Sequence, residues 1–304
     1  MIQNIDNIQI NFNSDSLWLV NLTLLLVMFG VALDIRVSDF TNLLKTPKVV
    51  IVGIISQFVL IPLVTFLLII IIKPHPSIAL GMIMVAACPG GNISNFMTKL
   101  ANGNIALSVS LTAFASVAAL IMTPLNFAIW GSFYEPTAAI LKTVEVDPLE
   151  VAKFVLLILG IPLVMGMIIQ NYYPKTATRL SNVLKPVSIL IFLTFIIVAF
   201  YNNLDVFMEH IHYVLLIVLL HNTVLFITGF YFAKINSLSY LDQKTLTIET
   251  GIQNSGLGLL LVFSFFDGLG GMALLVAFWA IWDILSGLLL AYFWSPKSNK
   301  KIIS

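Results

Sequence analysis

The sequence has 304 residues, of which 59% are hydrophobic and only 10% are charged. Soluble domains average about 45–50% apolar and about 25% charged residues, and the mean hydropathy of this chain is +1.02. So much apolar surface excludes a water-soluble protein and predicts a polytopic membrane protein. The formal net charge of +1, without a basic cluster, argues against a nucleic-acid partner. The single cysteine, Cys88, excludes an intrachain disulfide.

Long apolar runs follow a short polar start. Residues 1–16 are polar, lack Lys and Arg and do not match a secretory signal, so we expect an exposed extracellular or periplasmic tail. A helix crosses the ~30 Å hydrocarbon layer in about 20 residues, whereas a strand barrel shows alternating segments of about 10. The continuous runs therefore predict an all-α integral membrane protein. Nine transmembrane helices are expected, at about 17–34, 48–72, 76–101, 104–130, 149–172, 184–203, 211–234, 243–265 and 269–294.

The positions of Lys and Arg set the expected orientation. With the N-terminus outside, twelve of the 15 basic residues fall on the inner side and only Lys73, Lys142 and Lys153 fall on the outer side. The inner residues are Arg36, Lys45, Lys48, Lys99, Lys175, Arg179, Lys185, Lys234, Lys244, Lys297, Lys300 and Lys301. Cytoplasmic loops are enriched in Lys and Arg. We therefore expect a plasma-membrane protein (the inner membrane in a bacterium), N-terminus out, with residues 295–304 as a cytoplasmic tail.

No segment indicates a soluble domain or an ATP-binding module. The largest loop, at about 131–148, is too short for a domain, and the motif G-x-x-x-x-G-K-[ST] does not occur. If the chain transports a substrate, an ion gradient therefore drives the transport. No organic cofactor and no obligate protein partner is expected beside the lipid bilayer.

Two of the expected spans are interrupted at membrane depth. The third contains Cys88-Pro89-Gly90-Gly91-Asn92, and the eighth contains Glu249-Thr250-Gly251-Ile252-Gln253-Asn254. Pro removes a backbone donor and Gly costs ~1 kcal/mol relative to Ala in a helix, so we expect breaks near 88–92 and 249–254. Broken helices commonly hold the substrate and ion sites of secondary transporters. A kinked, Gly-rich packing face is the alternative interpretation.

The two interrupted spans lie five spans apart and therefore run in opposite directions. Each follows a helix with a mid-span amide, Gln57 or Asn222, and precedes an uninterrupted helix. Spans two to four are thus expected to mirror spans seven to nine as an inverted repeat, an arrangement found in many secondary transporters.

Glu249 is the most informative polar residue. A mid-span carboxylate costs several kcal/mol unless it is paired or neutralised, and no Lys or Arg lies in the middle of any expected span. Its partner is then a cation, a proton or a dense set of hydrogen bonds. Asp283, the second mid-span acid, has three interpretations: a cation ligand, a proton carrier, or an acid bonded to a Ser or an amide.

Several neutral oxygens near the breaks suit a small cation. Ser108 and Thr112 are four residues apart and share one helical face, while Ser94 and Asn95 follow the Gly pair. Two amides add carbonyl oxygens: Gln57 and Gln253.

Two other residues have a plainer interpretation. Cys88 is a candidate ligand for a soft metal, but a small buried hydrophobic side chain is favoured because a single thiol is weak evidence. His221 is expected to be structural.

Three segments resemble the bile acid:sodium symporter family: CPGGNISN at 88–95, GNIALSVSLT at 103–112 and TIETGIQNSG at 247–256. The resemblance runs from about Leu24 to Trp294. It implies a core domain formed by 48–130 and 211–294, in which the broken helices cross at their breaks. It also implies a panel domain formed by 17–34 and 149–203.

The resemblance further implies uptake of an organic anion with two sodium ions. The anion is bile-acid-like or a small carboxylate such as pantoate or a keto acid. Carried over residue by residue, one sodium site comprises Ser94, Asn95, Ser108, Thr112 and Glu249. The other comprises Gln57, Gln253 and Glu249, with the main-chain carbonyls of Thr250 and Ile252. The anion would lie at the half-helix N-termini near Asn92 and Asn254, with Asp283 close by.

Two features depart from the family pattern. Some bacterial relatives have ten spans, and this chain lacks the first of these, which thins the panel. Position 283 is often His in bacterial relatives, whereas here it is Asp283. Its negative charge would repel an anion unless the carboxylate is protonated, bound to a cation or turned away.

Other functions stay open on the sequence alone. Proton coupling through Glu249 or Asp283, or efflux of a small oxyanion such as arsenite, would replace sodium-coupled uptake. A transport-dead sensor is disfavoured because the chain has no signalling domain. A membrane-embedded enzyme is disfavoured because only the Glu249–Asp283 acid pair offers a catalytic set.

Overall fold

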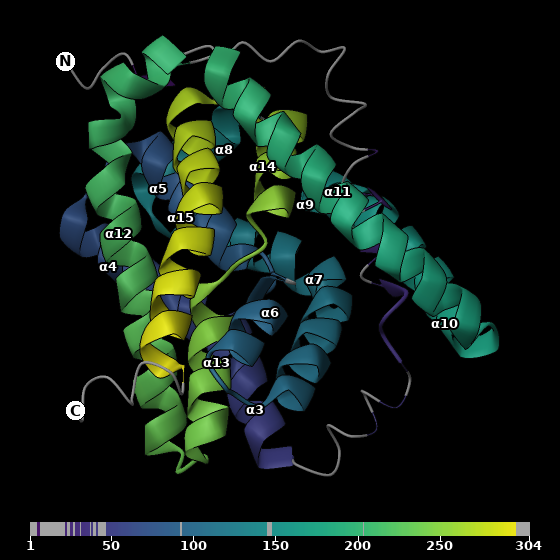
Figure 1. Cartoon of the computed structure of the whole chain (residues 1–304). Coiled ribbons are helices and arrows are strands. Elements are labelled where there is room, and N and C mark those ends of the chain that lie inside the picture. Colours follow the sequence, from purple (N-terminus) through teal and green to yellow (C-terminus); the bar gives the residue numbers. More distant parts are fainter. Residues whose placement is uncertain are drawn as a thin grey trace.

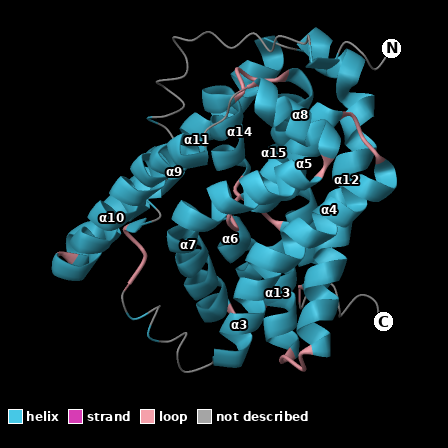
Figure 2. Cartoon of the chain, turned by 180° about the vertical axis from the view of Figure 1, so that it is seen from behind, coloured by secondary structure: helices cyan, strands magenta, loops and turns pink. Residues whose placement is uncertain are grey.

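The computed structural model describes residues 5–6, 22, 25–26, 28–30, 32–36, 38, 41, 47–91, 93–144, 148–202 and 204–295. Within these residues every named element from Pro47 onward is a helix. Figure 2 accordingly shows helices joined by loops. The prediction of an all-α protein is confirmed.

Thirteen α-helices follow one another from Pro47 to Trp294 in the described part of the chain. They are α3 (Pro47–Ile55), α4 (Ile61–Ile72), α5 (Pro76–Ala87), α6 (Ile93–Leu100), α7 (Ile105–Phe133), α8 (Glu135–Thr143), α9 (Pro148–Val155), α10 (Ile161–Tyr172), α11 (Pro174–Asn202), α12 (Leu204–Ile235), α13 (Tyr240–Gly251), α14 (Ser255–Phe265) and α15 (Gly270–Trp294). Single π-helical turns join α3 to α4 and α9 to α10: η2 (Ser56–Leu60) and η3 (Leu156–Gly160).

Five helical segments in the described residues are long and apolar enough to cross a membrane. They are Pro47–Ile72, Ile105–Phe133, Leu149–Tyr172, Val214–Ile235 and Gly270–Trp294. Their ends agree to within about three residues with five of the expected spans, which is the usual scatter of helix boundaries. These segments support a multi-pass membrane protein.

The other four expected spans differ in kind. The spans expected at 76–101 and 243–265 are each two shorter helices separated by a break, α5 with α6 and α13 with α14. The span expected at 184–203 falls in α11 up to its end at Asn202, and residue 203 lies outside the described residues. Half of the residues of the span expected at 17–34 lie outside the described residues, so the count of nine stays a prediction.

The π-helical turn η2 has an identifiable cause in Pro62. Proline has no N–H, so it cannot donate to the carbonyl of Phe58 four residues earlier. Asn126 of α7 supplies that donor, because its Nδ2 lies 3.1 Å from the Phe58 carbonyl oxygen. The turn holds Gln57, which is buried, in the interior of the molecule. The same Ile-Pro-Leu-Val sequence follows η3.

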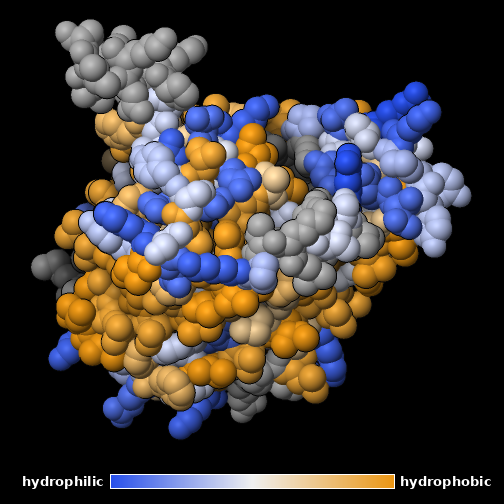
Figure 3. Space-filling model, turned by 90° about the horizontal axis from the view of Figure 1, so that it is seen from below, coloured by the Kyte–Doolittle hydropathy of each residue, from blue (hydrophilic) through white to orange (hydrophobic). Residues whose placement is uncertain are grey.

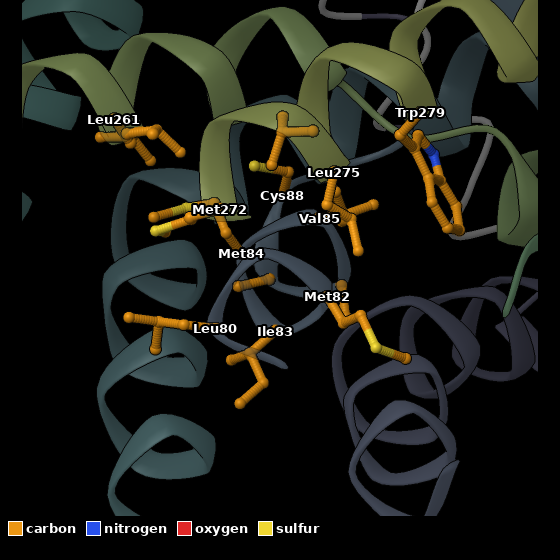
Figure 4. Packing of buried hydrophobic residues seen from close by; sticks show 14 of the residues in the cluster. Leu80, Met82, Ile83, Met84, Val85, Cys88, Leu261, Met272, Leu275 and Trp279 are labelled. Atoms are coloured by element: carbon orange, nitrogen blue, oxygen red, sulfur yellow. The ribbon is translucent and has the colours of Figure 1, made fainter. Parts of the chain in front are cut away.

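Helix α5 forms the centre of the largest hydrophobic cluster. All its residues from Ser77 to Ala87 are buried, and Figure 4 shows Leu80, Met84 and neighbours packing against Met272 and Leu275 of α15. A Cβ atom at Gly271 would lie 2.1 Å from Ser77 Oγ, so α5 and α15 can approach this closely only with glycine there.

Helices α12 and α15 run side by side, whereas α10 and α11 pair with each other at one side of the molecule (Figures 1 and 2). Large apolar side chains point outward, among them Ile71, Ile121 and Leu216, which are at least 71% exposed. Figure 3 shows broad apolar areas on the face that it presents. Apolar outward faces suit a lipid environment.

Candidate functional site

The breaks in the two interrupted helices pair with each other. Gly90 and Gln253 form an isolated antiparallel bridge. The Gly91 N–H donates to the Ile252 carbonyl (3.3 Å), and the Asn254 N–H donates to the Pro89 carbonyl (2.8 Å). Backbone groups that the helices release at their breaks are therefore satisfied by the other break rather than by lipid.

Glycine permits this approach. A Cβ atom at Gly91 would lie 3.0 Å from the Gln253 carbonyl oxygen, and one at Gly90 would lie 3.2 Å from Glu249 Oε2. A backbone oxygen cannot move aside as a flexible side chain can. The Gly pair therefore brings α5 and α6 against the end of α13, and it leaves the Glu249 carboxylate next to bare backbone.

Glu249 lies at the centre of the polar cluster and is only 5% exposed. Its Oε1 accepts hydrogen bonds from Ser94 Oγ (2.6 Å) and from Ser108 Oγ, and its Oε2 accepts one from Thr112 Oγ1 (3.1 Å). Three helices thus converge on one carboxylate: α6, α7 and α13. Hydrogen bonds to a charged acceptor are the strong ones.

Asn95 completes this first cluster. Its Oδ1 lies 2.8 Å from Ser108 Oγ and 3.3 Å from Thr112 Oγ1, so it is an alternative acceptor for the protons of these two hydroxyls. The structure thus brings together all five residues predicted for the first sodium site. In the described residues, none of the polar contacts of Glu249 is with a basic side chain.

The residues predicted for the second site also lie together. Gln57 Nε2 donates to Gln253 Oε1 (2.9 Å) and to the Cys88 carbonyl (3.1 Å). Gln253 Nε2 donates in turn to the Thr250 carbonyl (2.8 Å), and the Ile252 carbonyl accepts from the first break. Each main-chain oxygen keeps a second lone pair that is available to a cation.

A small pocket of about 10 Å³, enough for a single water-sized group, borders both clusters. Residues of α3, η2, α7 and α13 line it, with Gln57 and Glu249 among apolar neighbours such as Leu111 and Phe114. The pocket therefore lies beside the Glu249 carboxylate, between α3 and α7.

The residues predicted to bind the substrate are only partly described. Asn92 lies outside the described residues. Asn254 is the N-cap of α14, where its Oδ1 accepts from the Leu257 N–H (3.1 Å). Asp283 is 3% exposed, and its Oδ2 accepts hydrogen bonds from the Gln253 N–H and from Ser255 Oγ, each at 3.2 Å. Asp283 therefore lies against the second break itself.

Some contacts at the site were not expected from the sequence. The hydroxyls of Ser56 and Thr250 lie 2.9 Å apart, and Asn222 Nδ2 donates to the Gly251 carbonyl (2.8 Å). A mid-span amide was the sequence signal for Asn222, but its partner depends on the tertiary fold. The Cys88 side chain is fully buried in the hydrophobic cluster (Figure 4), which agrees with the hydrophobic interpretation of this thiol.

The sequence of the chain is similar to those of several known proteins. The family described as Sodium Bile acid symporter family matches residues 21–210. The uncharacterized sodium-dependent transporter YocS of Bacillus subtilis (strain 168) is 33% identical over 91% of this chain and 83% of its own. The probable chloroplastic sodium/metabolite cotransporter BASS1 of Arabidopsis thaliana is 30% identical over 92% of this chain and 67% of its own. The sodium-dependent organic anion transporter of Mus musculus is 32% identical over 75% of this chain and 60% of its own.

Proposed function

The chain belongs to the sodium bile acid symporter family, and from that premise we propose that it imports a small organic anion together with about two sodium ions. The family is one of transporters, not enzymes, and the chain is a multi-pass integral membrane protein.

The observation that carries the proposal is the environment of Glu249. A buried carboxylate with three hydroxyl donors and no basic partner among the described residues is costly in a membrane unless a cation neutralises it. Hydroxyl, amide and carboxylate oxygens are the ligands that hard cations prefer. We therefore assign one sodium ion to Ser94, Asn95, Ser108, Thr112 and Glu249.

We place the second ion between the Glu249 carboxylate and the side-chain amides near it. Its ligands are Gln57, Gln253 and Glu249, with the main-chain oxygens of Thr250 and Ile252. Sodium would turn the amide oxygens of Gln57 and Gln253 toward itself, at the cost of the hydrogen bond that now joins the two side chains. Both ions share Glu249, which would couple their binding.

Formal charges favour a monoanionic substrate. Two sodium ions, the Glu249 carboxylate and one monoanion sum to zero, so the loaded site is neutral. One net positive charge then enters with each cycle, which is worth about 2.3 kcal/mol per 100 mV of membrane potential. The anion would lie near the N-termini of α6 and α14, beside Asn92 and Asn254, where helix dipoles favour negative charge.

The proposed topology is nine spans with an inverted repeat. The antiparallel pairing of the two breaks supports it, because equivalent segments of an inverted repeat meet in opposite directions. Alternating access would move the core (48–130 and 211–294) against the panel (17–34 and 149–203).

Sodium-dependent thermal stability tests the ion sites first. Purified protein is unfolded by heat in sodium chloride and in potassium chloride of matched ionic strength, as wild type, Glu249→Gln and Ser116→Ala. A ligand that binds the folded state raises its stability, so we expect a sodium-specific rise in wild type that Glu249→Gln loses. Ser116 is the matched control, because its hydroxyl bonds to the Thr112 carbonyl rather than to Glu249.

The substrate is then sought in the presence of sodium. Pantoate, pyruvate and a bile acid are added to proteoliposomes under an inward sodium gradient, and the transport current is recorded. An inward positive current that needs both sodium and the anion supports the proposal. Equal stability in sodium and potassium, together with currents that follow a proton gradient, would assign the protein to the proton-coupled alternative.

A further inference from the structure

The second break has two edges, and only one of them pairs with the first break. Ile252 has extended backbone angles (φ −106°, ψ 114°). In extended backbone, the carbonyl before a residue and the N–H after it point to the same side, opposite to that residue's own carbonyl. The Ile252 carbonyl faces Gly91, so the Gly251 carbonyl and the Gln253 N–H face the other way.

Asn222 of α12 and Asp283 of α15 cover this second edge. Asn222 Nδ2 donates to the Gly251 carbonyl (2.8 Å), and Asp283 Oδ2 accepts from the Gln253 N–H (3.2 Å). Because both backbone groups flank the same extended residue, the two side chains lie next to each other along one edge. The amide thus lies beside the carboxylate.

Within the part of the chain that the structure describes, each of these side chains has one oxygen without a partner at hydrogen-bond distance: Asn222 Oδ1 and Asp283 Oδ1. Asn222 is 1% exposed and Asp283 is 3% exposed. Buried polar atoms are almost always paired, and a buried carboxylate without a counter-charge costs several kcal/mol. The indole N–H of Trp279 is a neutral donor near Asp283, so what these two side chains lack along the shared edge is a positively charged partner.

Neighbouring residues do not supply a counter-charge. In the described residues no salt bridge to Asp283 occurs. His221 precedes Asn222, and its Nε2 forms a hydrogen bond with Thr65 Oγ1 (2.7 Å). Its ring packs edge-on against Trp279, with 4.7 Å between the ring centroids. Trp279 precedes Asp283 by one helical turn, and Figure 4 shows its ring at the margin of the hydrophobic cluster.

We propose that Asn222 Oδ1 and Asp283 Oδ1 bind a further sodium ion, separate from the two that share Glu249. Both atoms are hard oxygen ligands, which suit an alkali or alkaline-earth cation rather than a soft metal. One carboxylate balances one positive charge, so the ion is monovalent. No group of three His, Cys, Asp or Glu side chains in the described residues could hold a divalent metal instead.

This ion ties α12 and α15 to the second break. It also changes the electrostatics near Asn254, since a cation-bound Asp283 no longer repels an anion at the N-terminus of α14. The identification of the ion as sodium rests on the proposed function, whereas the two unpaired oxygens do not depend on it.

Counting bound sodium in the purified full chain tests the site. Equilibrium dialysis against ²²Na⁺ in sodium chloride, with choline chloride holding ionic strength constant, gives the number of ions per chain at saturation. We expect three ions for wild type, two for Asp283→Asn and one for Glu249→Gln. Ser286→Ala is the matched control with three ions, because its hydroxyl bonds to the main-chain oxygen of Asp283 and not to the carboxylate.

The possible results separate the two proposals. Equal counts for wild type and Asp283→Asn, or no ion in Glu249→Gln while wild type binds two, would overturn the further site and leave the proposed function standing. A Glu249→Gln count equal to that of wild type would instead overturn the proposed function. If Asp283→Asn does not fold, the single ion expected in Glu249→Gln still decides the matter.

Discussion

Ser94 Oγ lies 2.6 Å from Glu249 Oε1, and this contact joins half-helix α6 to half-helix α13 across 155 positions of the sequence. The hydroxyl is 0% exposed and the carboxylate side chain 5%. The contact can therefore form only while the two broken helices stay together. The same two oxygens are proposed ligands of one sodium ion, so binding of that ion would stabilise the pairing of the breaks.

Ser108→Ala is expected to weaken sodium binding more than any loss of packing can explain. Ser108 Oγ lies within hydrogen-bond distance of both Glu249 Oε1 and Asn95 Oδ1. The variant removes one of the proposed oxygen ligands of the ion, so the sodium concentration for half-maximal stabilisation should rise roughly tenfold or more. Titration of melting temperature with sodium chloride measures this shift.

Ser116→Ala is the control for that titration, since Ser116 is also buried on α7 but bonds to the Thr112 carbonyl. A sodium titration of Ser108→Ala that overlays those of wild type and Ser116→Ala would contradict the first sodium site.

Gly91→Ala is expected to separate the two breaks. The new Cβ would lie 3.0 Å from the Gln253 carbonyl oxygen, a backbone atom that cannot rotate away. The hydrogen bond from the Gly91 N–H to the Ile252 carbonyl, already 3.3 Å, would lengthen or break. Transport current should fall by an order of magnitude or more, while the protein still inserts and remains monodisperse in detergent.

Gly160→Ala serves for comparison, because the nearest atom there is a side-chain methyl of Leu156 at 3.2 Å. Wild-type current in Gly91→Ala would mean that the close approach of the breaks is not needed for transport.

The site residues could be predicted from the sequence where the signal is a local pattern. Contacts that depend on how distant segments pack together could not be predicted. Glu249, Ser108 and Thr112 were recognisable because a carboxylate and hydroxyls in an apolar span are costly unless they are used. The breaks were recognisable from Pro89 and the glycines. Which side of the second break each polar residue covers was not, since it follows from the extended angles of Ile252 and the approach of α12 and α15.

The π-helical turn at Ser56–Leu60 could not be predicted from the sequence either, because the apolar pattern is continuous across it. Pro62 frees the Phe58 carbonyl, but whether the helix breaks, kinks or bulges depends on a donor from elsewhere. Asn126, 68 residues later, provides it. Pattern alone cannot find such a partner, although the proline marks where one is needed.

Gln57→Leu is expected to remove one of two coupled sodium ions. Leucine is close to glutamine in size but has no oxygen ligand and cannot donate to Gln253 Oε1 or to the Cys88 carbonyl. The first cluster around Ser94 is left intact. The Hill coefficient for sodium activation of transport should therefore fall from about 2 toward about 1.

Ser56→Ala is the companion variant, because Ser56 bonds to the Thr250 hydroxyl and not to a proposed ligand oxygen. An unchanged Hill coefficient in Gln57→Leu would show that Gln57 only packs the helices, as its position on an uninterrupted span also allows.

Lys244→Met is expected to destabilise the end of the molecule where α6, α13 and α15 meet. The ammonium group donates to the Ala101 carbonyl (2.9 Å) and the Trp294 carbonyl (3.2 Å), and it lies 5.0 Å from the ring centroid of Tyr240. Cations at helix C-termini are stabilising because they satisfy the last carbonyls and oppose the helix dipole. Methionine keeps most of the apolar stem but removes the donor from the buried Ala101 carbonyl, at a cost of about 1–3 kcal/mol, and from the partly buried Trp294 carbonyl. Melting temperature should therefore fall clearly in Lys244→Met, whereas Lys234→Met, on an exposed position of α12, should leave it within error. Because Glu249 on α13 and Ser94 on α6 lie one to two turns away from this contact, the sodium-dependent rise should survive in Lys244→Met but begin from a lower baseline. Equal melting temperatures for the two lysine variants would mean that water replaces the ammonium group at these carbonyls without loss.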